Sequence, residues 1–161
     1  MDFSLPNEIV EELDAFRDFL DRSLKPDLPA WYRSGTVPRA FYRTAADGGW
    51  FGIQWKDGRL VRTSALREAL IEEELAKRSP GVAVAVLAHV NLGFISLYLH
   101  GSENLKTRYG PPAAAAETFM CLGNTENRAG SDVAGIGMEA READGGWLLN
   151  GTKAYVTNGA V

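Results

Sequence analysis

The sequence holds a single cysteine, Cys121, and no block of like charge. One cysteine excludes an internal disulfide framework and any multi-cysteine metal site. Lys and Arg total 17 against 21 Asp and Glu, giving a net charge of -4. A nucleic-acid partner is not expected, because binding one usually requires a basic patch. The N-terminus carries acids where a signal peptide carries positive charge, so we expect a cytoplasmic protein.

The longest apolar stretch, residues 81–99, has no charged residue and is long enough to cross a membrane. Three polar residues, His89, Asn91 and Ser96, lie inside the run, and no aromatic belt with flanking lysines surrounds it. Residues 79–80, Ser-Pro, precede it as an ordinary helix cap. These details favour a buried helix in an all-α core over a membrane span.

Helical periodicity dominates the first part of the chain. Over residues 7–24 apolar side chains recur every three or four positions with acids between them, which is typical of an amphipathic helix, and Pro26 and Pro29 are expected to stop it. Further helices are predicted over residues 38–48, 64–77, 81–99 and 102–109. The sequence Gly-Pro-Pro at 110–112 is expected to end the last of them.

Beyond Thr118 the pattern changes to short extended segments separated by turns. Residues 119–122 predict an apolar strand, and Asp144-Gly145 and Asn150-Gly151 are hairpin turn signals. Further strands are predicted over about 134–143, 147–150 and 152–157. The fold class is therefore α+β, with an all-α N-terminal helical domain over residues 1–115 followed by the first strands of a β domain over residues 116–161.

Several apparent motifs carry little chemistry. Residues 135–140 fit the dinucleotide pattern G-x-G-x-x-A, but they neither follow a strand nor open a helix. His89, on an apolar helix, is interpreted as a core histidine with its hydrogen bonds satisfied rather than a base or ligand. Cys121 has no histidine near it in sequence to activate it as a nucleophile.

Two polar segments are more informative. Residues 125–132, Thr-Glu-Asn-Arg-Ala-Gly-Ser-Asp, follow an apolar run and form an irregular loop that offers hydroxyl and backbone N–H groups to a ligand. Such a loop could also be a plain polar hairpin. The second segment, residues 150–159, reads Asn-Gly-Thr-Lys-Ala-Tyr-Val-Thr-Asn-Gly and lies at a particular distance downstream.

The two segments together resemble the flavin-binding middle domain of acyl-CoA dehydrogenases. The helical part is similar to that family's N-terminal domain in the order of its elements, so the resemblance covers nearly the whole chain. It implies a truncated β-barrel-like middle domain after the helices. It also implies FAD as cofactor, with oxidation of an acyl-CoA thioester to the trans-2-enoyl-CoA through loss of an α-proton and a β-hydride.

The resemblance also implies roles for individual residues. Residues that would contact the flavin or its phosphates are Leu122, Gly123, Asn124, Thr125, Ser131, Tyr155, Val156 and Thr157. Ser131 could also contact the CoA side of the substrate, and Phe94 and Tyr98 would line the acyl cavity. As core residues Phe94 and Tyr98 would need no such role.

Two departures from the family pattern affect the expected site. Tyr155 stands where the family has tryptophan, so we expect flavin binding to survive with less stacking area. Asn127 and Arg128 replace a common Pro-Gly pair, which makes the turn less rigid and could place a cation near CoA or solvent. Glu126 is expected to be structural.

In the family the catalytic base is a carboxylate of a C-terminal helical domain, and no acid of this chain matches it. We therefore expect an N-terminal fragment that binds FAD weakly or not at all and does not turn over. The alternatives are a non-catalytic subunit completed by a partner chain, or a flavin enzyme of the same fold that oxidises nitroalkanes, hydroxylates aromatics or reduces enoyl-CoA.

The expected partners follow from the same resemblance. They are an acyl-CoA substrate and electron-transfer flavoprotein or a similar acceptor, with a homotetramer or homodimer for the full-length form. The sequence itself does not indicate the length or branching of the acyl chain.

Overall fold

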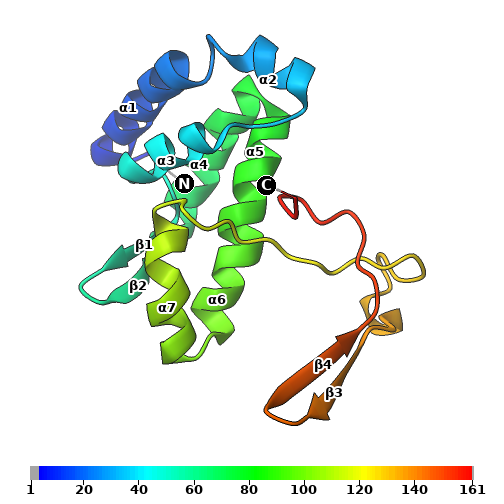
Figure 1. Cartoon of the computed structure of the whole chain (residues 1–161). Coiled ribbons are helices and arrows are strands. Elements are labelled where there is room, and N and C mark those ends of the chain that lie inside the picture. Colours follow the sequence, from blue (N-terminus) through cyan, green and yellow to red (C-terminus); the bar gives the residue numbers. More distant parts are fainter. Residues whose placement is uncertain (1–3, 161) are drawn as a thin grey trace.

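The protein is described by a computed structural model over residues 4–160. Its helices are α1 (Asn7–Ser23), α2 (Leu28–Ser34), α3 (Arg39–Asp47), α4 (Ala65–Arg78), α5 (Pro80–Leu87), the π-helix η1 (Ala88–Phe94), α6 (Ile95–His100), α7 (Glu103–Ala114) and the 3₁₀-helix η2 (Val133–Gly135). Its strands are β1 (Ile53–Lys56), β2 (Arg59–Arg62), β3 (Glu139–Ala143) and β4 (Gly146–Asn150). The helices gather in one group, and the β3–β4 hairpin stands away from them (Figure 1).

Serine side chains begin α4, α5 and α7. The hydroxyls of Ser64, Ser79 and Ser102 accept hydrogen bonds of 3.2–3.3 Å from the backbone N–H three residues ahead. Each cap satisfies a donor that the helix leaves unpaired and contributes about 1 kcal/mol. These caps fix where the helices start and hence the direction in which each enters the core.

The core forms where α1 packs on α4 and α4 packs on α5. Leu13, Phe16 and Leu20 recur on one face of α1 and are buried, and so are Ile71 and Leu75 of α4. The predicted amphipathic helix is thus confirmed, and its apolar face is the one that enters the core.

The β1–β2 hairpin is held between α4 and α7. Arg62 donates two hydrogen bonds to the buried carboxylate of Glu68, at 2.8 and 2.6 Å. On the other side, a Cβ at Gly110 would lie 2.9–3.0 Å from the side chains of Trp55 and Leu60. Glycine is therefore required where α7 crosses the hairpin.

The central helix is continuous through α5, η1 and α6, from Pro80 to His100. It is the one described helix long and apolar enough to cross a membrane, a test that core helices of soluble proteins also pass. The sequence predicted this helix but not its π-helical middle, because apolar periodicity over a few residues does not distinguish a wider turn from an α turn.

Several elements differ from the sequence predictions. Helix α1 ends at Ser23, before Pro26, as predicted, but Pro29 then lies in the first turn of an additional helix, α2, where its missing N–H costs nothing. Helix α7 continues through Pro111 and Pro112 to Ala114, and their carbonyls accept bonds from Ala115 and Glu117. Strand β2 was not anticipated, because its sequence, Arg-Leu-Val-Arg, is short and strongly charged.

The β region has fewer strands than the sequence predicted. Asp144-Gly145 does make the β3–β4 turn, with Gly145 at φ 81°. Residues 119–122 and 136–138 are not strands, because an extended segment becomes a strand only when it pairs with another. Residues 134–135 belong to η2, and the segment 152–157 is interrupted by Tyr155 at φ 55° and leads into a turn at Thr157. All residues of β3 and β4 are exposed, including the large side chains of Trp147 and Leu149.

Glu72 of α4 provides a test of the core's electrostatics. It borders a cavity of about 20 Å³, and burial, with a smaller effect of the Glu68 charge, raises its pKa to about 7. A raised carboxyl pKa adds stability at low pH that is lost as the pH rises through 7. We expect Glu72→Gln to stabilise the protein by about 1–2 kcal/mol at pH 8 and to change nothing at pH 4. Urea unfolding at both pH values measures this, and an equal effect at both would contradict it.

Candidate functional site

A cavity of about 170 Å³ opens between the central helix and the two polar segments. It is lined by Ala88, Leu92, Leu122, Asn124, Thr125, Ala154, Tyr155 and Thr157. The fold thus brings together five of the eight residues that were predicted to contact the cofactor, although they come from two segments far apart in sequence. Its lining combines neutral hydrogen-bonding side chains with one aromatic ring and apolar groups of the helix.

Lysine 153 and glutamate 126 join the two polar segments beside this cavity. The Ala154 N–H donates to the Thr125 carbonyl at 2.8 Å, and the Lys153 ammonium donates to the Asn124 carbonyl at 3.1 Å and to the Glu126 carboxylate at 2.7 Å. These bonds fix the distance between the walls that carry Thr125 and Tyr155.

The Glu126 carboxylate also holds the following loop. It accepts hydrogen bonds from the backbone N–H groups of Gly137 and Met138, at 2.8 and 3.0 Å. The hydrogen bond from Lys153, and then those from the backbone, lower the pKa of Glu126. A carboxylate engaged in this way is an ionised structural anchor, in agreement with its expected role.

Tyr155 presents its ring to solvent with unusual backbone geometry. The residue is 92% exposed, and its φ of 55° lies in the left-handed region that non-glycine residues rarely adopt. Three residues on, the Asn158 side-chain amide donates to the Ala85 carbonyl of α5 at 2.8 Å. The loop is therefore tied to the central helix while the tyrosine ring remains available for stacking.

The other predicted site residues lie outside the cavity lining. Gly123 and Val156 lie against each other, since a Cβ at Gly123 would be 3.5–3.6 Å from the side chains of Lys153 and Val156. Ser131 is exposed in the loop beyond Glu126. Phe94 is fully buried and stacks on His89 with ring centroids 6.1 Å apart, and Tyr98 is half-buried against the core.

Three lining residues were not predicted: Ala88, Leu92 and Ala154. Ala154 lies within the segment already singled out, between Lys153 and Tyr155. Ala88 and Leu92 are apolar residues on an apolar helix, so nothing in their sequence context distinguishes a cavity wall from a core position.

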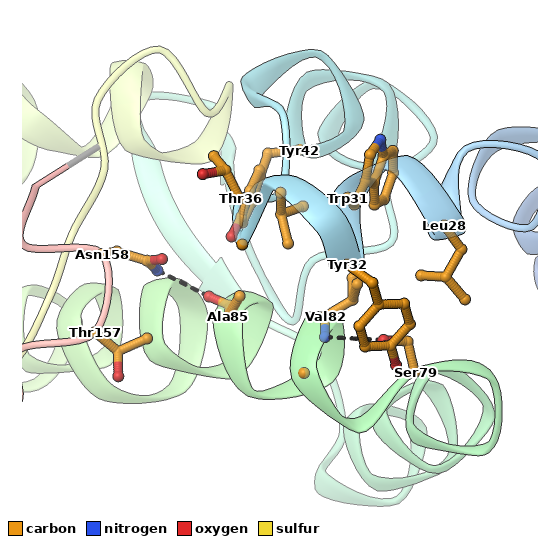
Figure 2. Close-up of a pocket in the computed structure, with 13 residues that line it drawn as sticks. Leu28, Trp31, Tyr32, Thr36, Tyr42, Ser79, Val82, Ala85, Thr157 and Asn158 are labelled. Atoms are coloured by element: carbon orange, nitrogen blue, oxygen red, sulfur yellow. Dashed lines mark hydrogen bonds between the residues drawn. The ribbon is translucent and has the colours of Figure 1, made fainter.

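A second cavity, of about 350 Å³, lies between α2 and α5 and shares Thr157 with the first. Figure 2 shows the rings of Trp31, Tyr32 and Tyr42 around it, with Asn158 at one end. The Tyr32 and Ser79 hydroxyls are hydrogen-bonded to each other at 3.0 Å. This space combines aromatic and apolar side chains with several hydroxyl groups and the amide of Asn158.

Neither cavity supplies a carboxylate. The lining of both cavities consists of apolar, aromatic, hydroxyl and amide side chains and glycine, and the described part of the chain has no cluster of histidine, cysteine and acidic residues suited to a metal ion. The 170 Å³ cavity can therefore orient a ligand through hydrogen bonds and stacking, but its own lining has no carboxylate or imidazole that could act as a general base.

Comparison with known proteins agrees with this geometry. The family model described as acyl-CoA dehydrogenase, N-terminal domain, matches residues 7–117. The chain belongs to the acyl-CoA dehydrogenase family. The predicted family and fold class, a helical N-terminal domain followed by a few strands, are thereby confirmed.

Individual family members match along the whole chain. Benzylmalonyl-CoA dehydrogenase of Aromatoleum aromaticum is 32% identical over 162 aligned positions, covering 100% of this chain and 43% of that protein. The crystal structure of an acyl-CoA dehydrogenase from Geobacillus kaustophilus superposes with a TM-score of 0.88 at 26% identity, over 99% of this chain and 42% of that one.

The FAD complex of PigA also matches, with a TM-score of 0.89 and 28% identity over 98% of this chain and 42% of that one. FAD-dependent dehydrogenation of acyl-CoA is therefore supported at the level of the acyl-CoA dehydrogenase family. The chain spans less than half the length of these three relatives.

Proposed function

We propose that this chain supplies one part of the FAD and acyl-CoA site of an enzyme that converts acyl-CoA to trans-2-enoyl-CoA. The observation that carries the proposal is the 170 Å³ cavity, where Thr125, Tyr155 and Thr157 meet between two segments joined by Lys153. FAD, when bound, would supply the hydride acceptor.

The lining fits a flat, polar heteroaromatic group. Asn124 and Thr125 can hydrogen-bond its polar edge, each bond contributing about 1 kcal/mol, while the exposed Tyr155 ring can lie against its face. Thr157 offers a further hydroxyl between the two cavities. Ala88 and Leu92 provide an apolar surface suited to the acyl group and help to exclude water from it.

Removal of the α-proton requires a base that this cavity lacks. We therefore propose that the carboxylate comes from outside residues 1–161 and that this chain alone binds FAD weakly and does not turn over. A subunit whose site is completed by a second chain would obtain its base in the same way. We also propose that the electrons pass to electron-transfer flavoprotein or a similar acceptor, and that the full-length form is a homotetramer or homodimer. The direct test is titration of the purified chain with FAD, followed near 450 nm, with and without an acyl-CoA.

Tyr155 offers a more specific test of flavin binding. We expect Tyr155→Ala to raise the FAD dissociation constant about two- to tenfold, because ring stacking contributes about 0.5–1.5 kcal/mol. Its effect on the free energy of unfolding should stay within about 0.5 kcal/mol, since the side chain is exposed. Tyr155→Trp is the matched control and should bind FAD at least as tightly as the unaltered chain. Equal FAD affinity in all three proteins would contradict the proposed role of this loop.

A further inference from the structure

The π-helix η1 presents two pairs of residues on adjoining faces. Ala88 and Leu92 line the 170 Å³ cavity, whereas His89 and Gly93 contact the segment that leads into it, residues 119–121. π-helical turns are rare and occur frequently at functional sites. The same turn therefore builds one wall of the cavity and anchors the segment that forms another.

His89 uses both ring nitrogens in this anchor. It is fully buried; the Met120 backbone N–H donates to its Nδ1 at 3.1 Å, and its Nε2 lies 3.1 Å from the Ala113 carbonyl. Because Met120 is the donor, Nδ1 must accept, so the proton is on Nε2 and is donated to Ala113. Burial lowers the pKa of His89 to about 4, so the ring is neutral at pH 7.

Gly93 brings the same segment directly onto the helix. A Cβ at this position would lie 2.5 Å from both the Met120 carbonyl carbon and the Cys121 nitrogen. No L side chain fits without moving that backbone. His89 and Gly93 thus fix Met120 and Cys121, and the chain then runs immediately into the lining residues Leu122, Asn124 and Thr125.

We propose that His89 is a positioning residue for the candidate flavin site, acting through the hydrogen bond that its Nδ1 accepts from Met120. The bond to Ala113 serves α7, whereas the bond from Met120 sets where residues 122–125 enter the cavity. The part of this proposal that concerns the cofactor rests on the proposed function, but the part that concerns the segment does not.

Two substitutions separate the two bonds. In His89→Asn the side-chain oxygen can take the place of Nδ1 and keep the Met120 bond while losing the one to Ala113. In His89→Gln the amide nitrogen can take the place of Nε2 and keep the Ala113 bond while losing the one from Met120. Each variant loses one buried bond and part of the ring packing, so a merely structural role predicts the same effect from both.

We expect hydrogen exchange and FAD affinity to distinguish the variants. His89→Gln should increase exchange of the Met120 amide at least tenfold relative to His89→Asn and should raise the FAD dissociation constant about tenfold. His89→Asn should keep FAD affinity within about threefold of the unaltered chain. Ser102→Ala, which removes the α7 cap far from the segment, is the control for general destabilisation and should leave FAD affinity unchanged.

If the two histidine variants fail to fold, Gly93→Ala replaces them and should weaken FAD binding by displacing Met120 and Cys121. Equal exchange of the Met120 amide in both histidine variants would overturn the proposal, and so would an unchanged FAD affinity in His89→Gln. If Gly93→Ala is used in their place, an unchanged FAD affinity in that variant would overturn it. If the unaltered chain does not bind FAD, the proposed function of this chain fails while the exchange measurement still decides whether His89 positions the segment.

Discussion

Replacing Phe94 by alanine is expected to lower the free energy of unfolding by about 3–5 kcal/mol. Phe94 is fully buried in the last turn of η1, and its ring stacks on His89. Truncation removes the apolar area of a whole ring and leaves a cavity that the rigid helix cannot fill. Chemical denaturation monitored by circular dichroism measures the loss.

The same variant tests whether Phe94 acts on the substrate. Phe94→Leu retains most of the buried volume and should cost about 1–2 kcal/mol, which makes it the matched control. An alanine variant as stable as the unaltered protein would contradict the core role. Such a result would favour the other predicted role of Phe94, which is to line the acyl cavity. The same role would be favoured for Tyr98 if replacing it altered ligand binding without altering stability.

Removing the Glu74 carboxylate is expected to cost about 2–3 kcal/mol. Glu74 of α4 is buried and accepts from Arg17 at 2.8 Å, Lys77 at 3.0 Å and Arg78 at 3.1 Å. Breaking a buried ion pair from one side costs about 3–5 kcal/mol, and the loss in Glu74→Ala should be smaller because Arg17 and Lys77 can reach solvent. Asp14→Ala, which removes the exposed partner of Arg17, is the control and should cost less than about 0.5 kcal/mol.

The pH dependence of stability provides an independent measurement. Hydrogen bonds, first of all that from Arg17, lower the pKa of Glu74 to about 2. Its stabilisation is complete above its usual pKa near 4.5 and is lost as the pH falls through 2, because the unfolded state binds the proton first. Glu74→Gln should therefore flatten the loss of stability between pH 4.5 and pH 2. An unchanged slope would show that Glu74 is not the group responsible.

The sequence predicts the helices better than the strands for a physical reason. Helix α1 can be recognised from its own apolar periodicity, and α4 from its apolar side and Ser64 cap, because both signals are local. Strand β2 depends instead on pairing with β1 and on the contact between Arg62 and Glu68. Neither partner is visible in the residues of β2 themselves, and the one local signal for this hairpin is the Asp57-Gly58 pair, which makes the turn between β1 and β2.

The same distinction applies to the site. Thr125, Tyr155 and Thr157 were predicted because they belong to motifs, and the structure places all three around one cavity. Ala88 and His89 carry no motif, and their roles follow only from which side of the helix meets the incoming segment. The contacts of the three motif residues with the cofactor remain predictions, as do the roles of Ser131, Phe94 and Tyr98, the domain boundary near residue 115 and the cytoplasmic location.

The π-helix also affects how this chain should be compared with its relatives. A π turn contains about one residue more than an α turn, and one residue corresponds to about 100° around the helix axis. If one of two helices contains such a turn and the other does not, residues at the same count after the turn point in different directions. For a relative whose helix lacks the π turn, equivalent positions in α6 must be assigned by the neighbours they contact, because counting from Pro80 would assign acyl-chain preferences to the wrong side chains.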